Sequence, residues 1–255
     1  MKTVSSGKKT TIIFDSLADY RRTMEAETGV EYSYSNISER MDKWHGTETW
    51  GEFMELLSYG DDKITDKIKV ATGKAVKEYQ NKYEKVLTNY KFDVVGEFFD
   101  IGLVMQGVPE TWLNPEFEEA EKPKADITIN GSFPDGTDLD NIIANASKIL
   151  GMAKILEDND VMVSIKVVTG GEKFMTGDKT LYMETMVKAY DEPINFSKCS
   201  SLLSPTYLRR GWFKMAEKTA GNKIRSNYGK IINVDGALEL RNDNSIRDFE
   251  RKVFK

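Results

Sequence analysis

The alternation of apolar and polar residues is most regular between residues 124 and 168. ADITING (125–131) alternates as a half-buried strand does, and VMVSIKVV (161–168) is a dense β-branched run. Between them, residues 138–158 carry an apolar stripe at helical spacing, made of Ile142, Ala146, Ile149, Leu150, Ala153 and Leu156. We therefore predict a βαβ unit with parallel, neighbouring strands, because a helical crossover joins them.

The N-terminal part predicts one strand and then helices. TTIIFDS (10–16) is a short strand candidate, and Ser16 is placed to cap the helix that follows. SSGKKTT (5–11) contains Gly-Lys-Lys-Thr, but no strand precedes it and the first glycine of a phosphate loop is missing. We expect a flexible start there.

Two further helices are expected before residue 92. One begins at Thr47 or Thr49 and stops at Gly60. The other runs from Ile64 to Tyr90, with an apolar stripe on one face and lysines on the opposite face.

The remaining segments complete an α/β (or α+β) fold. Residues 93–123 are acidic, hold three of the six prolines and are predicted to be a linker or wrap. Residues 179–192 predict a strand, and residues 195–219 predict a helical region interrupted at Pro205. The expected organisation is a mainly helical region 1–92, the linker 93–123 and an α/β domain 124–255.

Composition restricts the chemistry. The chain has 255 residues, 40% hydrophobic and 30% charged, which is typical of a globular protein. Cys199 is the only cysteine and His45 the only histidine, so disulfides within the chain, cysteine-rich metal centres and histidine-rich metal sites are excluded. Cys199 is expected to be a buried, inert thiol. With no apolar run near the roughly 20 residues of a membrane span, we expect a cytoplasmic protein.

The net charge of -5 is distributed unevenly. Residues 204–230 contain seven Lys or Arg and one acid, and residues 63–91 contain eight Lys and three acids. Residues 96–121 contain seven acids and no base. Two basic surfaces and one acidic segment are therefore possible.

The segment 204–230 interleaves bases with aromatic residues, the mixture with which proteins bind single-stranded nucleic acid. The candidate contacts are Arg209, Arg210, Trp212, Lys214, Arg225, Tyr228 and Lys230. In the alternative interpretation, Tyr207, Leu208, Trp212 and Met215 form a buried face. Arg209, Arg210, Lys214 and Lys218 then point outward as a solvated helix face.

The loop NGSFPDGTDLD (130–140) joins the carboxyl end of a strand to the start of a helix, where α/β sheets bind ligands. It lacks the glycine spacings of dinucleotide and phosphate loops. The simpler interpretation is a turn at Asp135-Gly136 and a helix N-cap at Thr137 or Asp138.

This order of strand, oxygen-rich loop, amphipathic helix and apolar strand resembles a von Willebrand factor A domain. In that family an Asp-x-Ser-x-Ser run helps to hold a divalent cation. The resemblance implies a degenerate Mg²⁺ site at Asp126, Thr128 and Asn130, or at Thr128, Asn130 and Ser132. The second set lacks the carboxylate that a hard cation prefers.

The chain also resembles uncharacterised proteins encoded by bacteriophages and other mobile elements. The resemblance is carried by WHGTETWGEFMELLSYGD (44–61), DVVGEFFDIGLVMQGVPETWL (93–113), the βαβ unit and LLSPTYLRRGWFKMAE (202–217). It implies an origin but transfers no catalytic residue.

Three hypotheses for the function follow. The first is a phage-type, non-catalytic protein that binds nucleic acid or the machinery handling it. The second is an assembly factor that docks on a host or virion protein through the loop 130–138 and the acidic segment 96–121. The third is a metal-dependent enzyme.

Overall fold

The structure is a computed structural model. It describes residues 1–26, 46–47, 49–82, 90–93, 98–99, 105, 112–115, 122–134, 136–175, 179–220 and 232–253.

A six-stranded mixed sheet has the strand order β1-β2-β8-β7-β6-β9. Its strands are β1 (Lys2–Ser6), β2 (Lys9–Phe14), β6 (Lys124–Asn130), β7 (Met162–Met175), β8 (Lys179–Lys188) and β9 (Leu238–Glu239). β6 runs parallel to both β7 and β9, and β2 runs parallel to β8. The β1–β2 and β7–β8 pairs are antiparallel. The helix α6 (Leu139–Asp158) connects β6 to β7, so the predicted βαβ unit and the α/β class are confirmed.

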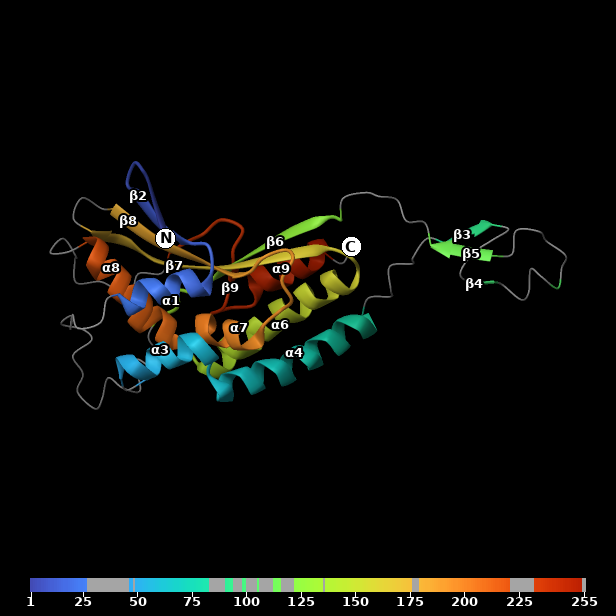
Figure 1. The fold of residues 1–255 in the computed structure, drawn as a ribbon, viewed down its shortest axis with the longest axis horizontal. Coiled ribbons are helices and arrows are strands. Elements are labelled where there is room, and N and C mark those ends of the chain that lie inside the picture. Colours follow the sequence, from blue (N-terminus) through green and yellow to red (C-terminus); the bar gives the residue numbers. More distant parts are fainter. Residues whose placement is uncertain are drawn as a thin grey trace.

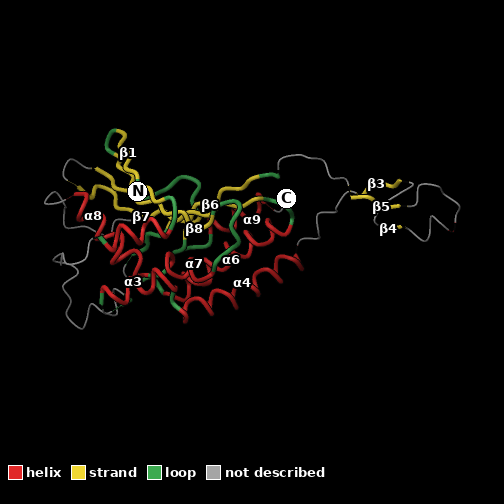
Figure 2. The backbone as a smooth tube through the Cα atoms, viewed as in Figure 1, coloured by secondary structure: helices red, strands yellow, loops and turns green. Residues whose placement is uncertain are grey.

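The helices lie on one side of this sheet (Figure 1), and the tube view separates the same two layers (Figure 2). Besides α6 they are α1 (Leu17–Glu25), α3 (Trp50–Tyr59), α4 (Asp62–Lys82), α7 (Phe196–Leu203), the π-helix η1 (Tyr207–Trp212), α8 (Phe213–Ala220) and α9 (Asn244–Val253). No described helix is both long and apolar enough to cross a membrane.

Local capping signals fix several helix ends. Ser16 Oγ accepts a hydrogen bond from the Asp19 amide at 3.1 Å, and Thr49 forms a capping box with Glu52. Asp138 is the N-cap of α6, where the sequence predicts either Thr137 or Asp138. α3 ends at Gly60, whose φ of 84° favours glycine, and a Cβ there would lie 2.9 Å from the Ser197 Cα.

Three expectations at the sequence level need correction. Residues 2–6 form β1 rather than a flexible start, because they pair with β2 in a hairpin. The helix predicted to reach Tyr90 is described over Asp62–Lys82, and it does not include Tyr90, which begins the strand β3 (Tyr90–Asp93). β3, β4 (Phe98–Phe99) and β5 (Trp112–Pro115) form a separate antiparallel sheet of order β3-β5-β4 within and next to the expected linker.

The segments 1–92 and 124–255 share one hydrophobic core. Ile12 on β2, Ile68 on α4, Ile149 on α6 and Ile246 on α9 are all buried in the same cluster. The N-terminal strands also pair with β8. The predicted boundary between a helical region and an α/β domain therefore does not divide this core, because the apolar faces of both segments complete each other.

Candidate functional site

The described part of the predicted nucleic-acid segment, residues 204–219, lies largely in the interior. Trp212 is fully buried, and Arg210, Lys214 and Arg209 are only 5%, 6% and 9% exposed. The predicted stacking surface is therefore absent at these four residues. The alternative interpretation is confirmed for its apolar face, because Tyr207, Leu208, Trp212 and Met215 are all buried, and for Lys218, which is exposed. It is wrong for Arg209, Arg210 and Lys214, which do not point outward. Arg225, Tyr228 and Lys230 lie outside the described residues.

The buried bases contact other parts of the core. Arg210 Nε donates to Thr47 Oγ1 at 2.7 Å, and Lys214 Nζ lies 5.1 Å from the centre of the Trp50 ring. The Arg209 guanidinium lies 5.9 Å from the centre of the Phe133 ring, in the loop after β6. Such cation–π contacts join η1 and α8 to neighbouring segments, so these bases have a structural role.

The π-helix explains why helical spacing failed here. A π-helix closes i→i+5 hydrogen bonds, so it turns its side chains away from the positions that a 3.6-residue period gives. All six residues from Tyr207 to Trp212 are buried. At Gly211 the Tyr20 hydroxyl approaches so closely that an added Cβ would lie 1.7 Å from it. Sequence alone offered no signal for this contact.

The residues of the predicted metal site do not converge. Residues four apart on a strand are about 13 Å apart along its axis, which separates Asp126 from Asn130. The Asp126 carboxylate accepts hydrogen bonds from the Ser164 hydroxyl and from Tyr190 Oη, the latter at 2.6 Å. These bonds, with that from Ser164 the larger cause, lower the pKa of Asp126. Thr128 lies between Asp126 and Asn130 on the same strand face.

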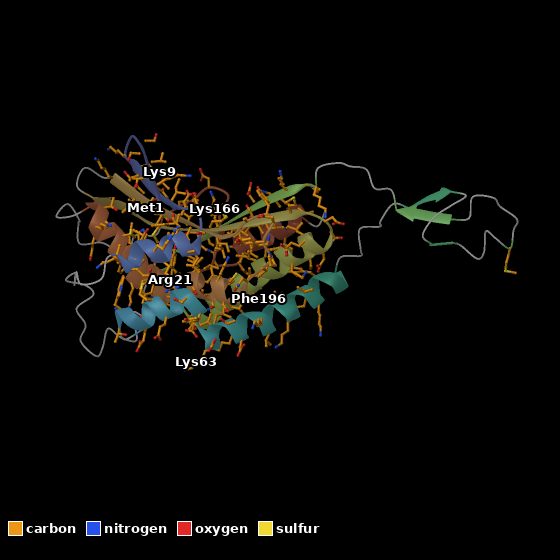
Figure 3. The ribbon with its side chains drawn as sticks, in the orientation of Figure 1. Met1, Lys9, Arg21, Lys63, Lys166 and Phe196 are labelled. Carbon is orange, nitrogen blue, oxygen red and sulfur yellow. The ribbon has the colours of Figure 1, made fainter. Side chains whose placement is uncertain are left out.

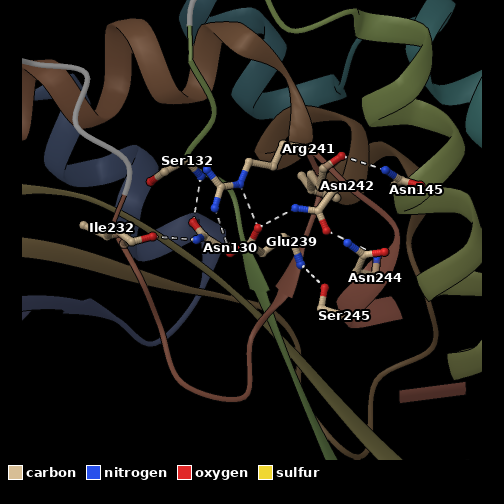
Figure 4. Close-up of polar contacts among 10 residues, drawn as sticks. Asn130, Ser132, Asn145, Ile232, Glu239, Arg241, Asn242, Asn244 and Ser245 are labelled. Carbon is tan, nitrogen blue, oxygen red and sulfur yellow. Dashed lines mark hydrogen bonds and ion pairs between the residues drawn. The ribbon is translucent and has the colours of Figure 1, made fainter. Parts of the chain in front are cut away.

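Asn130 and Ser132 are instead part of a polar network at the carboxyl ends of β6 and β9 (Figure 4). Asn130 Nδ2 donates to the Ile232 carbonyl at 3.0 Å, and Asn130 Oδ1 accepts from the Ser132 amide at 3.0 Å. Ser132 Oγ accepts from the Gly170 amide at 3.0 Å. The side chains of Asn130 and Ser132 are thus hydrogen-bonded within the protein. Asp135, of the turn predicted at Asp135-Gly136, lies outside the described residues.

Glu239 and Arg241 belong to a second group of polar contacts at the same edge (Figure 4). Arg241 donates to both carboxylate oxygens of Glu239, at 2.7 and 3.2 Å, and Asn242 Nδ2 donates at 2.8 Å. The hydrogen bond from Arg241 is the main cause that lowers the pKa of Glu239. Within the described ranges no group of three His, Cys, Asp or Glu is arranged to hold a metal ion.

The face of the sheet opposite the helices, which we call the open face, carries a second set of charged and aromatic residues. Strand alternation and register place Lys2, Lys9, Lys124, Asp126, Thr128, Lys166, Tyr182 and Glu184 on it. Lys9 lies on the sheet side of the molecule in Figure 3, whereas Lys63 and Phe196 lie among the helices.

Two tyrosines on the open face sit beside lysines. Lys9 Nζ lies 4.2 Å from the centre of the Tyr182 ring, and Lys124 Nζ lies 5.9 Å from that of Tyr190. The Lys166 ammonium is neutralised by Glu184 at 3.2 Å, whereas Lys9 and Lys124 form no ion pair within the described part of the chain. Sequence analysis missed this surface because it follows strand register across distant segments.

The two tyrosines remain protonated at neutral pH. Burial, and next the nearby Glu172 and Asp235, raise the pKa of Tyr182. The hydrogen bond to Asp126 is the main cause that raises the pKa of Tyr190. The open face therefore combines neutral aromatic rings with lysine and carboxylate side chains.

Cys199 and His45 are the remaining residues that the sequence singles out. Cys199 is buried, and burial raises the pKa of its thiol to about 12, which fits the predicted inert thiol. His45 lies outside the described residues.

The fold defines a mixed α/β protein with helices on one face of its main sheet and an opposite face that carries lysines, carboxylates and tyrosines. The chain belongs to the DUF7192 family, described as a domain of unknown function, whose model matches residues 2–251. Comparison with curated proteins and with solved structures gives no match.

Proposed function

We propose that this protein is a non-catalytic, phage-type binding protein for single-stranded nucleic acid, with the open face as its contact surface. The observation that carries the proposal is the Lys9–Tyr182 pair, with Nζ 4.2 Å from the ring centre, on a sheet face that no described helix covers. The proposal includes the cytoplasm as location, which suits the single buried thiol of Cys199.

The two kinds of side chain supply complementary energies. Lysine neutralises phosphate and releases counterions, and a stacked base on an aromatic ring contributes about 1–3 kcal/mol. Single-stranded nucleic acid suits the surface, because only unpaired bases expose their faces to stacking.

The Lys9–Tyr182 pair and the Lys124–Tyr190 pair lie at separate points of the open face. Lys9 and Tyr182 lie on the neighbouring strands β2 and β8, whereas Lys124 begins β6 and Tyr190 follows β8. Tyr190 is held in place by its hydrogen bond to Asp126. A bound strand is therefore expected to run across the sheet from one pair to the other.

Fluorescence anisotropy with labelled single-stranded and duplex oligonucleotides tests the proposal. The native protein is compared with Lys9→Glu/Lys124→Glu and with the control Lys63→Glu/Lys74→Glu, which makes the same charge change on exposed lysines of α4. We expect salt-sensitive binding that only the first variant loses. The variant Lys9→Gln/Lys124→Gln removes two positive charges without adding negative ones. Because each lost phosphate contact changes the slope for single strands by about 0.7, the slope of log K against log salt should become shallower by about 1.4.

A ring-specific variant separates stacking from charge. Tyr182→Phe keeps the ring and should bind as the native protein does, whereas Tyr182→Ser should bind more weakly by about 1–3 kcal/mol. Absence of binding by the native protein at low salt, or equal losses in the open-face and α4 variants, would overturn the proposal.

A second candidate function is docking on a host or virion protein through the carboxyl edge of β6 and β9. The observation that favours it is Arg241, which Glu239 holds in a fixed orientation while 38% of its side chain stays exposed. Its remaining guanidinium donors suit a carboxylate of a partner. Loss of a co-purifying partner in Arg241→Ala, with nucleic-acid binding unchanged, would support it. Most of the acidic segment 96–121 lies outside the described residues.

A further inference from the structure

β1 is an edge strand of the main sheet and is longer than β9, the strand at the opposite edge. All five of its residues are exposed, and β2 is its only neighbour in the strand order. The opposite edge strand, β9, has only two residues. Apart from Lys2 at its start, β1 lacks the usual protection of an edge strand, because residues 3–6 contain no charge and no proline and the pairing with β2 has no register shift.

The hairpin turn determines which backbone groups of β1 are unused. Gly7 and Lys8 form a two-residue turn, so the closing pair Ser6 and Lys9 exchanges hydrogen bonds. Hydrogen-bonded and non-hydrogen-bonded pairs alternate along an antiparallel ladder. The backbone groups of Lys2, Val4 and Ser6 therefore point to β2, and those of Thr3 and Ser5 point outward.

We propose that β1 pairs with β1 of a second copy of this chain, antiparallel and centred on Val4. In this register Thr3 of each copy faces Ser5 of the other, and their outward backbone groups form four hydrogen bonds. Val4 then faces Val4 at a non-hydrogen-bonded position, where side chains are closest. Val4 is 53% exposed, so this contact removes apolar surface from water.

The charges permit this pairing. Lys2 faces Ser6 of the other copy, and its own ammonium is 3.3 Å from Asp15. No like charges stand directly opposite. Five paired residues bury less than about 1,000 Å², so the dimer is weak and forms at high concentration or on a shared ligand.

The geometry has a functional consequence. The twofold axis is perpendicular to the sheet, so both open faces lie on the same side of one continuous sheet. The dimer itself does not depend on nucleic-acid binding, and it is tested in the absence of nucleic acid.

Sedimentation velocity over a wide range of protein concentration is the first test. We expect reversible dimerisation of the native chain and a monomer for Val4→Lys, because two ammonium groups then face each other across the axis. Val70→Lys changes a comparably exposed valine, 61% exposed on α4, and should dimerise normally. Circular dichroism checks that each variant is folded.

Disulfide trapping tests the register. Under mild oxidation Val4→Cys should give a covalent dimer, since the two introduced thiols are opposite each other at the closest pair. Ser5→Cys, one position along, should not. The buried Cys199 does not interfere. A native protein that stays monomeric, a dimer that survives Val4→Lys, or equal trapping in both cysteine variants would overturn the proposal.

Discussion

Arg209 on η1 lies over the ring of Phe133, its guanidinium carbon 5.9 Å from the ring centre. Arg209 belongs to the basic segment and Phe133 to the loop after β6, two segments that sequence analysis treats as separate candidate surfaces. Both residues are buried. The contact therefore ties the π-helix to the carboxyl edge of the sheet and takes both residues out of direct ligand contact.

Because of this contact, we expect the stability of the protein to depend on the planar guanidinium of Arg209. Arg209→Lys keeps the charge but loses the flat group that stacks on a ring, so we expect a loss of about 1 kcal/mol in the free energy of unfolding. Urea denaturation measures it. In a double-mutant cycle with Phe133→Leu, additive losses would contradict a direct contact.

Gly211 should be sensitive to a single methyl group. Gly211→Ala places Cβ 1.7 Å from the Tyr20 hydroxyl, so we expect a loss of stability of at least about 1–3 kcal/mol. Gly73→Ala is the control, because nothing lies within 4 Å of its Cβ and alanine favours a helix by about 1 kcal/mol.

A second substitution, at Tyr20, should restore stability to the Gly211→Ala variant. Its hydroxyl finds no hydrogen-bond partner within the described part of the chain, so Tyr20→Phe alone should be neutral or stabilising. Tyr20→Phe/Gly211→Ala should recover much of the lost stability in thermal unfolding. A double variant as unstable as Gly211→Ala would show that the clash lies elsewhere.

Lys188 is a buried cation with a complete set of partners. Its ammonium donates to the Val163 carbonyl at 2.6 Å and to the Ala189 carbonyl at 3.0 Å, and lies 2.7 Å from Glu157. Lys188→Met leaves these acceptors unsatisfied, and we expect a loss of about 3 kcal/mol in urea denaturation. Glu157 is partly exposed, so Glu157→Gln should lower the free energy of unfolding by less than Lys188→Met does. Equal losses in the two variants would contradict the role of Lys188 as a buried cation with several partners.

Cys199 predicts a loss of stability at alkaline pH. Burial raises the pKa of its thiol from 9.0 to about 12, so the unfolded chain ionises first as the pH rises. The contribution of the thiol is complete below pH 9 and is lost as the pH rises toward 12. Urea denaturation between pH 8 and 11 should show a weaker pH dependence for Cys199→Ala. Identical slopes in both proteins would contradict the prediction.

Local sequence signals predicted the elements that depend on neighbouring residues. Ser16, Asp138 and Gly60 satisfy or terminate helix ends through groups within a few positions, so their roles are readable from the chain. The βαβ unit follows from periodicity, because a strand and a helix bury different sets of positions.

Register and long-range packing were decided only by the tertiary structure. Lys9 and Tyr182 are 173 positions apart and meet because β2 pairs with β8, a pairing that no local pattern encodes. Arg209, Arg210 and Lys214 have the composition of a basic surface, yet they are buried, because a base with an aromatic or polar partner can enter a core. The sequence by itself determined the βαβ unit, several helix caps and the α/β class. Which charged residues face solvent depended on the partners that folding brought to them.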